Sequence, residues 1–225
     1  MTSKAQEAGR LQAARMADGD PYTLSLPADF IPERVYPLVL SLHFGGPVSP
    51  FYGRALLEGV VEPALRQLDA IMIAPDCPES RWADPACEHR VLRLLDEIAE
   101  RYQIDAARIV ITGYSKGGIG TWDLALRHPD RFSAAIVMAG RPAAGAIGGA
   151  WQVPLYVIHA EEDELMPLTD TRQVVQTLRD RGVPVEFEVL QGVGHYQTDR
   201  FIEPLRRAVP WLQRMWGESD APSTQ

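Results

Sequence analysis

Residues 113–117, with the sequence GYSKG, place a serine between two glycines at a point where the hydrophobic pattern changes from strand to helix. Residues 108–112 form an apolar run typical of a buried strand, and residues 116–127 show helical spacing. A sharp strand-to-helix turn strains the backbone of its central residue, and flanking glycines keep neighbouring Cβ atoms out of the way. The segment therefore predicts a turn that presents Ser115 as a nucleophile.

Apolar β-rich runs alternate with helical patterns along the chain, which is typical of a mainly parallel sheet flanked by helices on both faces. The 225 residues, 46% of them hydrophobic, suit one large core, so we expect a single α/β domain over 1–225. The polar ends, 1–17 and 217–225, are expected to be loose extensions. The expected strands are 22–26, 36–42, 70–74, 108–112, 133–138, 153–159 and 185–190, and the expected helices are 55–67, 88–102, 116–127, 170–181 and 202–216.

Composition limits the kind of partner. The net charge of -8 and the scattered lysines and arginines argue against nucleic acid and anionic membranes, and favour a small or neutral molecule. The first thirty residues lack an apolar core of signal-peptide length, and no run of eighteen apolar residues follows, so we expect a cytoplasmic protein. The chain has two cysteines, Cys77 and Cys87, which are too few for a fold built on disulfides. Because they flank one loop, a local disulfide between them is one of two outcomes that the sequence allows.

A serine hydroxyl is a poor nucleophile at neutral pH, so Ser115 needs a base within hydrogen-bond reach, and the base needs an acid to orient it. The candidate base is His195, in the glycine-rich segment GVGHY at 192–196. This segment follows the last expected strand and precedes the last expected helix. The remaining histidines lie at strand ends, at a helix start or before a proline, where structural or surface roles suit them better: His43, His89, His128 and His159.

The acid should come between the serine and the histidine, on the loop after the penultimate strand. Residues 159–167, HAEEDELMP, offer four carboxylates there. This segment resembles the HGxxDxxVP pattern of α/β-hydrolases, with Ala160 in place of glycine and Met166 in place of valine. The resemblance implies Asp163 as the acid, with Glu162 as its main rival.

The resemblance covers nearly the whole chain. Residues 26–30, 36–43, 104–109 and 128–132 are similar to esterases and predicted peptidases of the α/β-hydrolase superfamily, in the branch of feruloyl-esterase-like and polyhydroxybutyrate-depolymerase-like proteins. It implies an α/β-hydrolase fold. Only residues 139–152 separate two expected strands where such folds carry large caps, so we expect an open cleft with no large cap domain.

The fold also implies two backbone N–H groups that stabilise an oxyanion. One is that of Lys116, the residue after the serine. The other belongs to the loop HFGGP at 43–47, where relatives carry His-Gly-x. Position x is Gly45, but Phe44 replaces the usual glycine and is the alternative donor. We expect the Lys116 side chain at the pocket rim, in a surface role or in contact with substrate.

Phe44, Trp82 and Tyr196 are candidates for the substrate pocket, each with packing as the plain alternative. Neither a cofactor fingerprint nor metal-ligand spacing is found, so we expect neither group. The first hypothesis is a serine carboxylesterase that acts on a small-molecule ester through an acyl-enzyme. A peptidase, acyltransferase or thioesterase with the same residues is the alternative, and a non-catalytic binding protein of this fold is the alternative of another class. The oligomeric state is left open.

Overall fold

The computed structural model describes residues 11–142, 145–146 and 148–217. Within them, eight strands form one sheet in the order β1-β2-β4-β3-β5-β6-β7-β8. The first three of this order pair antiparallel, and all pairs from β4 to β8 are parallel, which confirms the mainly parallel sheet. The strands are β1 (Leu11–Arg15), β2 (Pro21–Ser25), β3 (Tyr36–Leu42), β4 (Ile71–Pro75), β5 (Ile104–Tyr114), β6 (Ala134–Met138), β7 (Leu155–Ala160) and β8 (Val185–Leu190).

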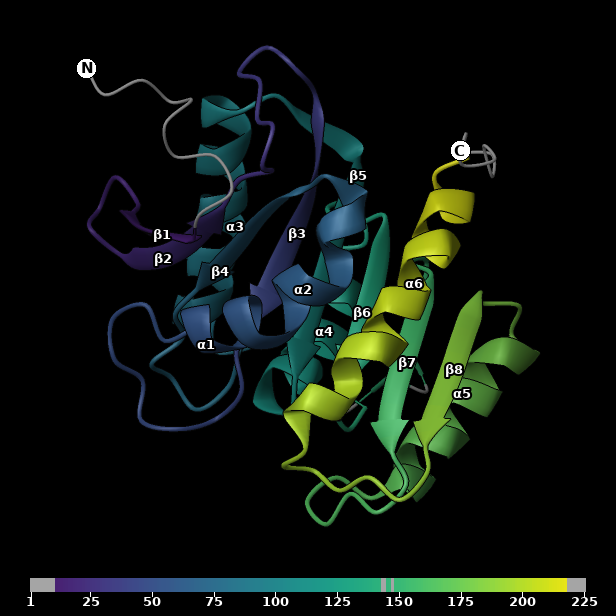
Figure 1. Ribbon diagram of the computed structural model, residues 1–225. Coiled ribbons are helices and arrows are strands. Elements are labelled where there is room, and N and C mark those ends of the chain that lie inside the picture. The colour runs from purple at the N-terminus through teal and green to yellow at the C-terminus, as the bar shows by residue number, and fades with distance from the viewer. Residues whose placement is uncertain (1–10, 143–144, 147, 218–225) are drawn as a thin grey trace.

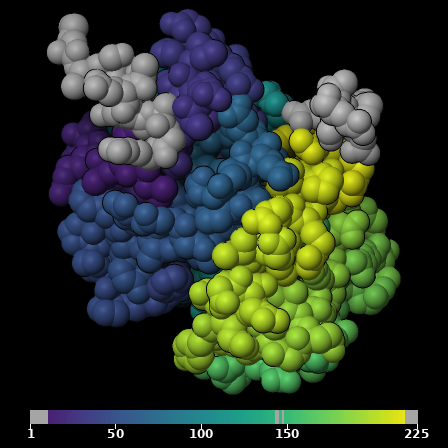
Figure 2. Space-filling view, viewed as in Figure 1, coloured from purple at the N-terminus to yellow at the C-terminus, as the bar shows by residue number. Residues whose placement is uncertain are grey.

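Helices cover both faces of the sheet, as expected. In Figure 1, α6 (yellow) and the α1–α2 segment (blue) lie in front of the sheet, and α3, α4 and α5 lie behind it. The space-filling view shows this front layer covering most of the strands (Figure 2). The helices are α1 (Arg54–Leu56), α2 (Glu62–Leu65), α3 (Pro85–Arg101), α4 (Lys116–Arg127), α5 (Leu168–Asp180) and α6 (Ile202–Met215), with a short 3₁₀ turn at Thr198–Phe201.

The central strand β3 shows why the core has two halves. All seven of its residues are buried, as expected for a parallel strand covered on both faces. Because successive side chains point to opposite faces, Leu38 and Leu40 pack in the cluster under α3, α4 and α5, whereas Val39 packs under α2 and α6. Each such fully buried aliphatic side chain contributes about 1.5–3 kcal/mol.

The helix expected over 55–67 is broken in the structure. A π-helical turn at Leu57–Val61 separates α1 from α2, and a 3₁₀ turn follows at Arg66–Leu68. Pro63 lies just after the π-helical turn and has no N–H to donate to the carbonyl of Gly59, with which its ring would also collide in a regular α-helix. A wider turn places that carbonyl out of the way.

The N-terminal extension expected over 1–17 is wrong at residues 11–15, which form the edge strand β1. This strand pairs antiparallel with β2, from Leu11 opposite Ser25 to Arg15 opposite Pro21. Its side chains are mostly half exposed, so the hydrophobic pattern carried no signal, and backbone pairing stabilises it. Residues 1–10 and 218–225 lie outside the described part of the chain, and the single domain stays a prediction.

The parallel strands all end at the same edge of the sheet, the lower edge in Figure 1. The loops after β3, β4, β5, β7 and β8 therefore lie near one another, and in open α/β sheets this edge is where ligands bind. Every residue that the sequence singled out for chemistry lies on one of these five loops or at the start of α4.

Candidate active site

The turn between β5 and α4 has the strained backbone that the sequence predicts. Ser115 has φ 56° and ψ -114°, a conformation that residues with a side chain rarely adopt. Its neighbours allow this by close approach: a Cβ on Gly113 would lie 2.4 Å from the carbonyl oxygen of Gly117, and one on Gly117 would lie 1.9 Å from that of Leu42. The serine is half exposed at the end of β5.

Ser115, His195 and Asp163 form a continuous chain of hydrogen bonds. The Oγ of Ser115 lies 2.8 Å from Nε2 of His195, whose Nδ1 lies 2.8 and 2.9 Å from the two carboxylate oxygens of Asp163. Because a carboxylate accepts, Nδ1 carries the proton and Nε2 is left to accept the serine proton. The three residues come from the loops after β5, β7 and β8, and the geometry is that of a nucleophile, a base and an acid.

The carboxylate of Asp163 is buried and held by its own loop. Its Oδ1 also accepts hydrogen bonds from the backbone N–H groups of Leu165 and Met166, at 3.0 and 2.7 Å. Glu162, the rival acid, is exposed and its side chain lies away from His195; only its backbone N–H contributes, through a hydrogen bond to the carbonyl of Val193. The structure thus pairs the histidine with Asp163.

Two residues next to this site, Glu164 and His159, support it in ways that the sequence did not predict. Glu164 accepts a hydrogen bond from the backbone N–H of His195 at 2.9 Å, and that bond lowers the pKa of the Glu164 carboxyl. His159 is fully buried, and burial lowers its pKa. Its neutral ring donates from Nε2 to the carbonyl of Met166 and thereby closes the loop that holds Asp163. A sequence shows that an acidic residue or a histidine lies near a site, but it does not show which backbone group that side chain binds.

The backbone of Gly45 lies beside Lys116, the residue after the serine. A Cβ built on Gly45 would lie 3.9 Å from Cβ of Lys116. Within the described chain, neither the N–H of Gly45 nor that of Lys116 donates a hydrogen bond, and Gly45 is exposed. Two unused donors therefore lie next to Ser115, where an oxyanion would form during attack on a carbonyl.

The Lys116 side chain, which we expected at the pocket rim, is half-buried and tied to the loop after β4. Its ammonium donates to the backbone carbonyls of Cys77 and Glu79, at 3.0 and 2.5 Å, and burial lowers its pKa. Cys77 and Cys87 form a disulfide across this loop, with their Cα atoms 5.4 Å apart. The disulfide that the sequence allowed but did not decide is therefore present.

Trp82 is the pocket candidate that the structure contradicts. Its side chain is 1% exposed and its indole N–H donates to the carbonyl of His43, so it fixes the loop by packing and does not face a ligand. Phe44 is half-buried against Tyr52, with ring centroids 5.7 Å apart. Tyr196 is 73% exposed, with its ring edge-on to that of His195 at 5.5 Å. A pocket role for Phe44 and Tyr196 stays a prediction.

A groove of about 890 Å³ lies between α4 and α5. Its lining includes Ile119, Asp123, Arg141 and Gln173 but not Ser115, His195 or Asp163. No group of three metal-ligating side chains occurs among the described residues. In the same part of the chain, no helix has the length and apolar character needed to cross a bilayer.

Comparisons with known proteins agree with this fold. Residues 80–204 match the model of the dienelactone hydrolase family. The chain is 29% identical over 164 residues to a probable feruloyl esterase C of Aspergillus niger, a match that covers 67% of this chain and 57% of that protein. The chain thus spans a little over half the length of the curated relatives that it matches.

Two solved structures extend the comparison. A thermostable esterase superposes with a TM-score of 0.77 at 25% identity, over 94% of this chain and 64% of that one. A ferulic acid esterase superposes with a TM-score of 0.72 at 21% identity, over 92% and 97% of the two chains. They confirm the α/β-hydrolase fold, and the feruloyl esterase relative confirms the resemblance to feruloyl-esterase-like proteins. Since the family model covers more than half of its residues, this chain belongs to the dienelactone hydrolase family.

Proposed function

We propose that the protein is a serine hydrolase that cleaves carboxylic esters through an acyl-enzyme. The observation that carries the proposal is the hydrogen-bonded chain from Ser115 through His195 to Asp163, next to two unused backbone donors. His195 accepts the serine proton as Oγ attacks the ester carbonyl, and Asp163 stabilises the imidazolium that forms. His195 then protonates the leaving alcohol and activates water to release the acid.

The oxyanion of each tetrahedral intermediate would be stabilised by the N–H groups of Lys116 and Gly45. Each such donor contributes about 2.7–4 kcal/mol to catalysis in enzymes of this kind. No cofactor and no metal take part in this cycle. Peptide or thioester cleavage and acyl transfer use the same residues and differ in the leaving group or the acceptor, so they are the alternatives that assays must separate.

We propose an ester with an aromatic acyl group as the substrate class. The relatives named feruloyl esterases suggest it, and the exposed ring of Tyr196 lies edge-on to that of His195. Phe44, which directly precedes the proposed donor Gly45, is a second aromatic candidate. Aromatic rings bind aromatic groups by offset or edge-to-face contact, worth about 0.5–1.5 kcal/mol a pair.

The test is hydrolysis of p-nitrophenyl acetate and of methyl ferulate, together with labelling by a fluorophosphonate. We expect turnover and a label on Ser115, both lost in Ser115→Ala and both kept in Ser49→Ala, a change at an exposed serine. A folded protein that is neither labelled nor active would support the non-catalytic alternative. Faster turnover of a thioester or a peptide than of either ester would support the other hydrolases.

A further inference from the structure

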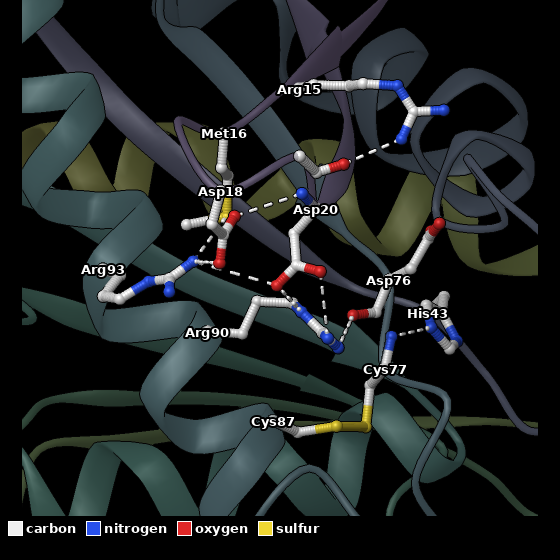
Figure 3. Close-up of polar contacts among 11 residues, drawn as sticks. Arg15, Met16, Asp18, Asp20, His43, Asp76, Cys77, Cys87, Arg90 and Arg93 are labelled. Carbon is white, nitrogen blue, oxygen red and sulfur yellow. Dashed lines mark hydrogen bonds and ion pairs between the residues drawn. A yellow bond between two sulfur atoms is a disulfide. The ribbon is translucent and has the colours of Figure 1, made fainter.

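His43 lies at the end of β3, is fully buried, and has both ring nitrogens in hydrogen bonds. Nε2 lies 2.9 Å from the backbone N of Cys77, and Nδ1 lies 2.7 Å from the carbonyl oxygen of Phe44. Figure 3 shows the contact with Cys77 beside its disulfide to Cys87. A backbone N–H only donates, so Nε2 accepts, and the ring proton is on Nδ1, which donates to Phe44.

This ring remains neutral under ordinary conditions. Burial, with a smaller contribution from the ammonium of Lys116, lowers the pKa of His43 to about 4, against the raising effect of the bond to Phe44. A neutral imidazole has one donor and one acceptor nitrogen, and the partners on both sides match that pattern. The tautomer is therefore set by the fold.

The bond to Phe44 also determines where the next N–H points. The carbonyl of Phe44 and the N–H of Gly45 belong to one peptide unit, and no described peptide bond is cis. In a trans peptide these two groups point in opposite directions. Because the His43 ring holds the carbonyl, the N–H of Gly45 faces away from that ring. Gly45 itself is exposed and lies beside Lys116.

The ring itself is held from several sides. Cys77, which binds Nε2, is fastened by its disulfide to the start of α3 and by its carbonyl to the ammonium of Lys116. The rings of Tyr52 and Trp82 pack edge-on against it, with centroids 4.9 and 4.8 Å away. Rotation of the imidazole would break both hydrogen bonds, so the direction of the Phe44 carbonyl is fixed as well.

We propose that His43 is a positioning residue for the second oxyanion donor. Its Nδ1–H fixes the peptide between Phe44 and Gly45, so that the N–H of Gly45 joins that of Lys116 at the oxygen of the tetrahedral intermediate. The proposal rests on the proposed ester hydrolysis, and it takes Gly45 as the second donor. His43 touches no substrate; it acts through the peptide that it holds.

Two substitutions separate the donor from the acceptor role of the ring. In His43→Asn, the amide nitrogen can occupy the place of Nδ1 and donate to Phe44. In His43→Gln, the amide reaches the place of Nε2 and serves Cys77, but it leaves Phe44 without a donor. We expect His43→Gln to lower kcat about 10²-fold with KM changed less than about three-fold, and His43→Asn to retain at least about ten-fold more kcat, because a misaimed oxyanion donor acts on the transition state alone.

The matched control is His89→Gln, a change at an exposed histidine of α3, which should leave kcat and KM at the wild-type values. Equal losses in the Asn and Gln variants would show that His43 only fills space and would overturn the proposal. Wild-type kcat in His43→Gln, or a loss confined to KM, would overturn it too.

A measurement on the wild type covers the case in which the variants do not fold. Nitrogen-15 NMR of the imidazoles, with His43 assigned through its contacts with the rings of Tyr52 and Trp82, should show His43 protonated on Nδ1 and unprotonated on Nε2 from pH 8 to pH 5. A proton on Nε2 would overturn the proposal. If the wild type itself neither hydrolyses an ester nor is labelled on Ser115, the proposed function fails instead, whatever the tautomer.

Discussion

The phenol of Tyr114 donates a hydrogen bond to the backbone carbonyl of His195, at 2.5 Å between the two oxygens. The residue before the proposed nucleophile therefore fixes the loop of the proposed base, from inside the core. Burial and the nearby carboxylates of Asp163 and Glu164 raise the pKa of Tyr114, so the phenol stays protonated and remains a donor over the whole working range of pH.

Tyr114→Phe should weaken both the site and the fold. The carbonyl of His195 would lose its buried donor, which costs about 1–3 kcal/mol in the free energy of unfolding. We expect urea unfolding to show this loss and kcat to fall several-fold, because the imidazole is held less well against Ser115. Unchanged stability together with unchanged kcat would show that the bond contributes nothing.

Asp163→Asn should remove most activity without unfolding the protein. An amide at this position can donate to Nδ1 and so favours the wrong tautomer, in which Nε2 no longer accepts the serine proton; a loss of about 10⁴ in kcat is typical. Glu162→Gln is the matched control and should keep full activity, since its side chain is exposed and lies away from His195. If steady-state kinetics showed a large loss of kcat in Glu162→Gln and none in Asp163→Asn, Glu162 would be the acid.

Acid should destabilise the fold through His43. Its pKa is about 4 in the folded protein against 6.5 for a free histidine, so between these values the unfolded state binds more protons. Stability contributed by the neutral ring is complete above pH 6.5 and is lost as pH falls toward 4; at pH 5 the loss is about 2 kcal/mol. Urea unfolding at pH 7 and pH 5 measures it. The pH slope should be smaller in His43→Gln, and an equal slope in both proteins would exclude His43 as a source.

Reduction of the disulfide should lower stability as well. Cys77 and Cys87 are ten residues apart, and the chain-entropy model gives about 2–3 kcal/mol for a loop of that length. A dithiol such as dithiothreitol supplies the two electrons and two protons that convert the bridge to two thiols and is itself oxidised to a cyclic disulfide. Thermal unfolding with and without the dithiol should differ in the wild type. The double variant Cys77→Ser, Cys87→Ser should show no such difference; the same shift in that variant would assign the effect to the reagent.

The bridge also bears on the compartment. A cytoplasmic location stays a prediction, and the disulfide points the other way, because cytosolic thiols are normally kept reduced. We propose that the native protein works with the bridge closed. Fractionation of the source cells, with alkylation of free thiols before lysis, would test both statements: labelled thiols in a cytosolic fraction would contradict the closed bridge.

Most of the fold could be predicted because its signals are local. Buried strands such as β3 are continuous apolar runs, and the amphipathic helices α3 and α5 repeat at helical spacing, so seven of the strands and most helices were expected near their observed bounds. The exceptions depend on backbone bonds. The edge strand β1 is stabilised by pairing with β2, and the distortion near Pro63 follows from a missing N–H, which hydrophobic periodicity does not register.

The site divides in the same way. Ser115 could be predicted from its glycines, and His195 and Asp163 from chain order and a motif, because a strand-to-helix turn leaves a local signature and the loops after parallel strands meet at one edge. The packing of Trp82 could not be predicted, because an aromatic residue on a loop looks the same in sequence whether it faces a ligand or the core.

The sequence by itself determined the order of the strands after β1 and of most helices, the proposed nucleophile and base, and the loop that carries the acid, since these follow from local pattern and chain order. The tertiary structure alone decided that Asp163, and not Glu162, pairs with His195. It also decided that Cys77 forms a disulfide with Cys87 and that the His43 ring holds the carbonyl of Phe44. Those outcomes depend on the direction of single hydrogen bonds between segments far apart in the chain, and packing sets that direction.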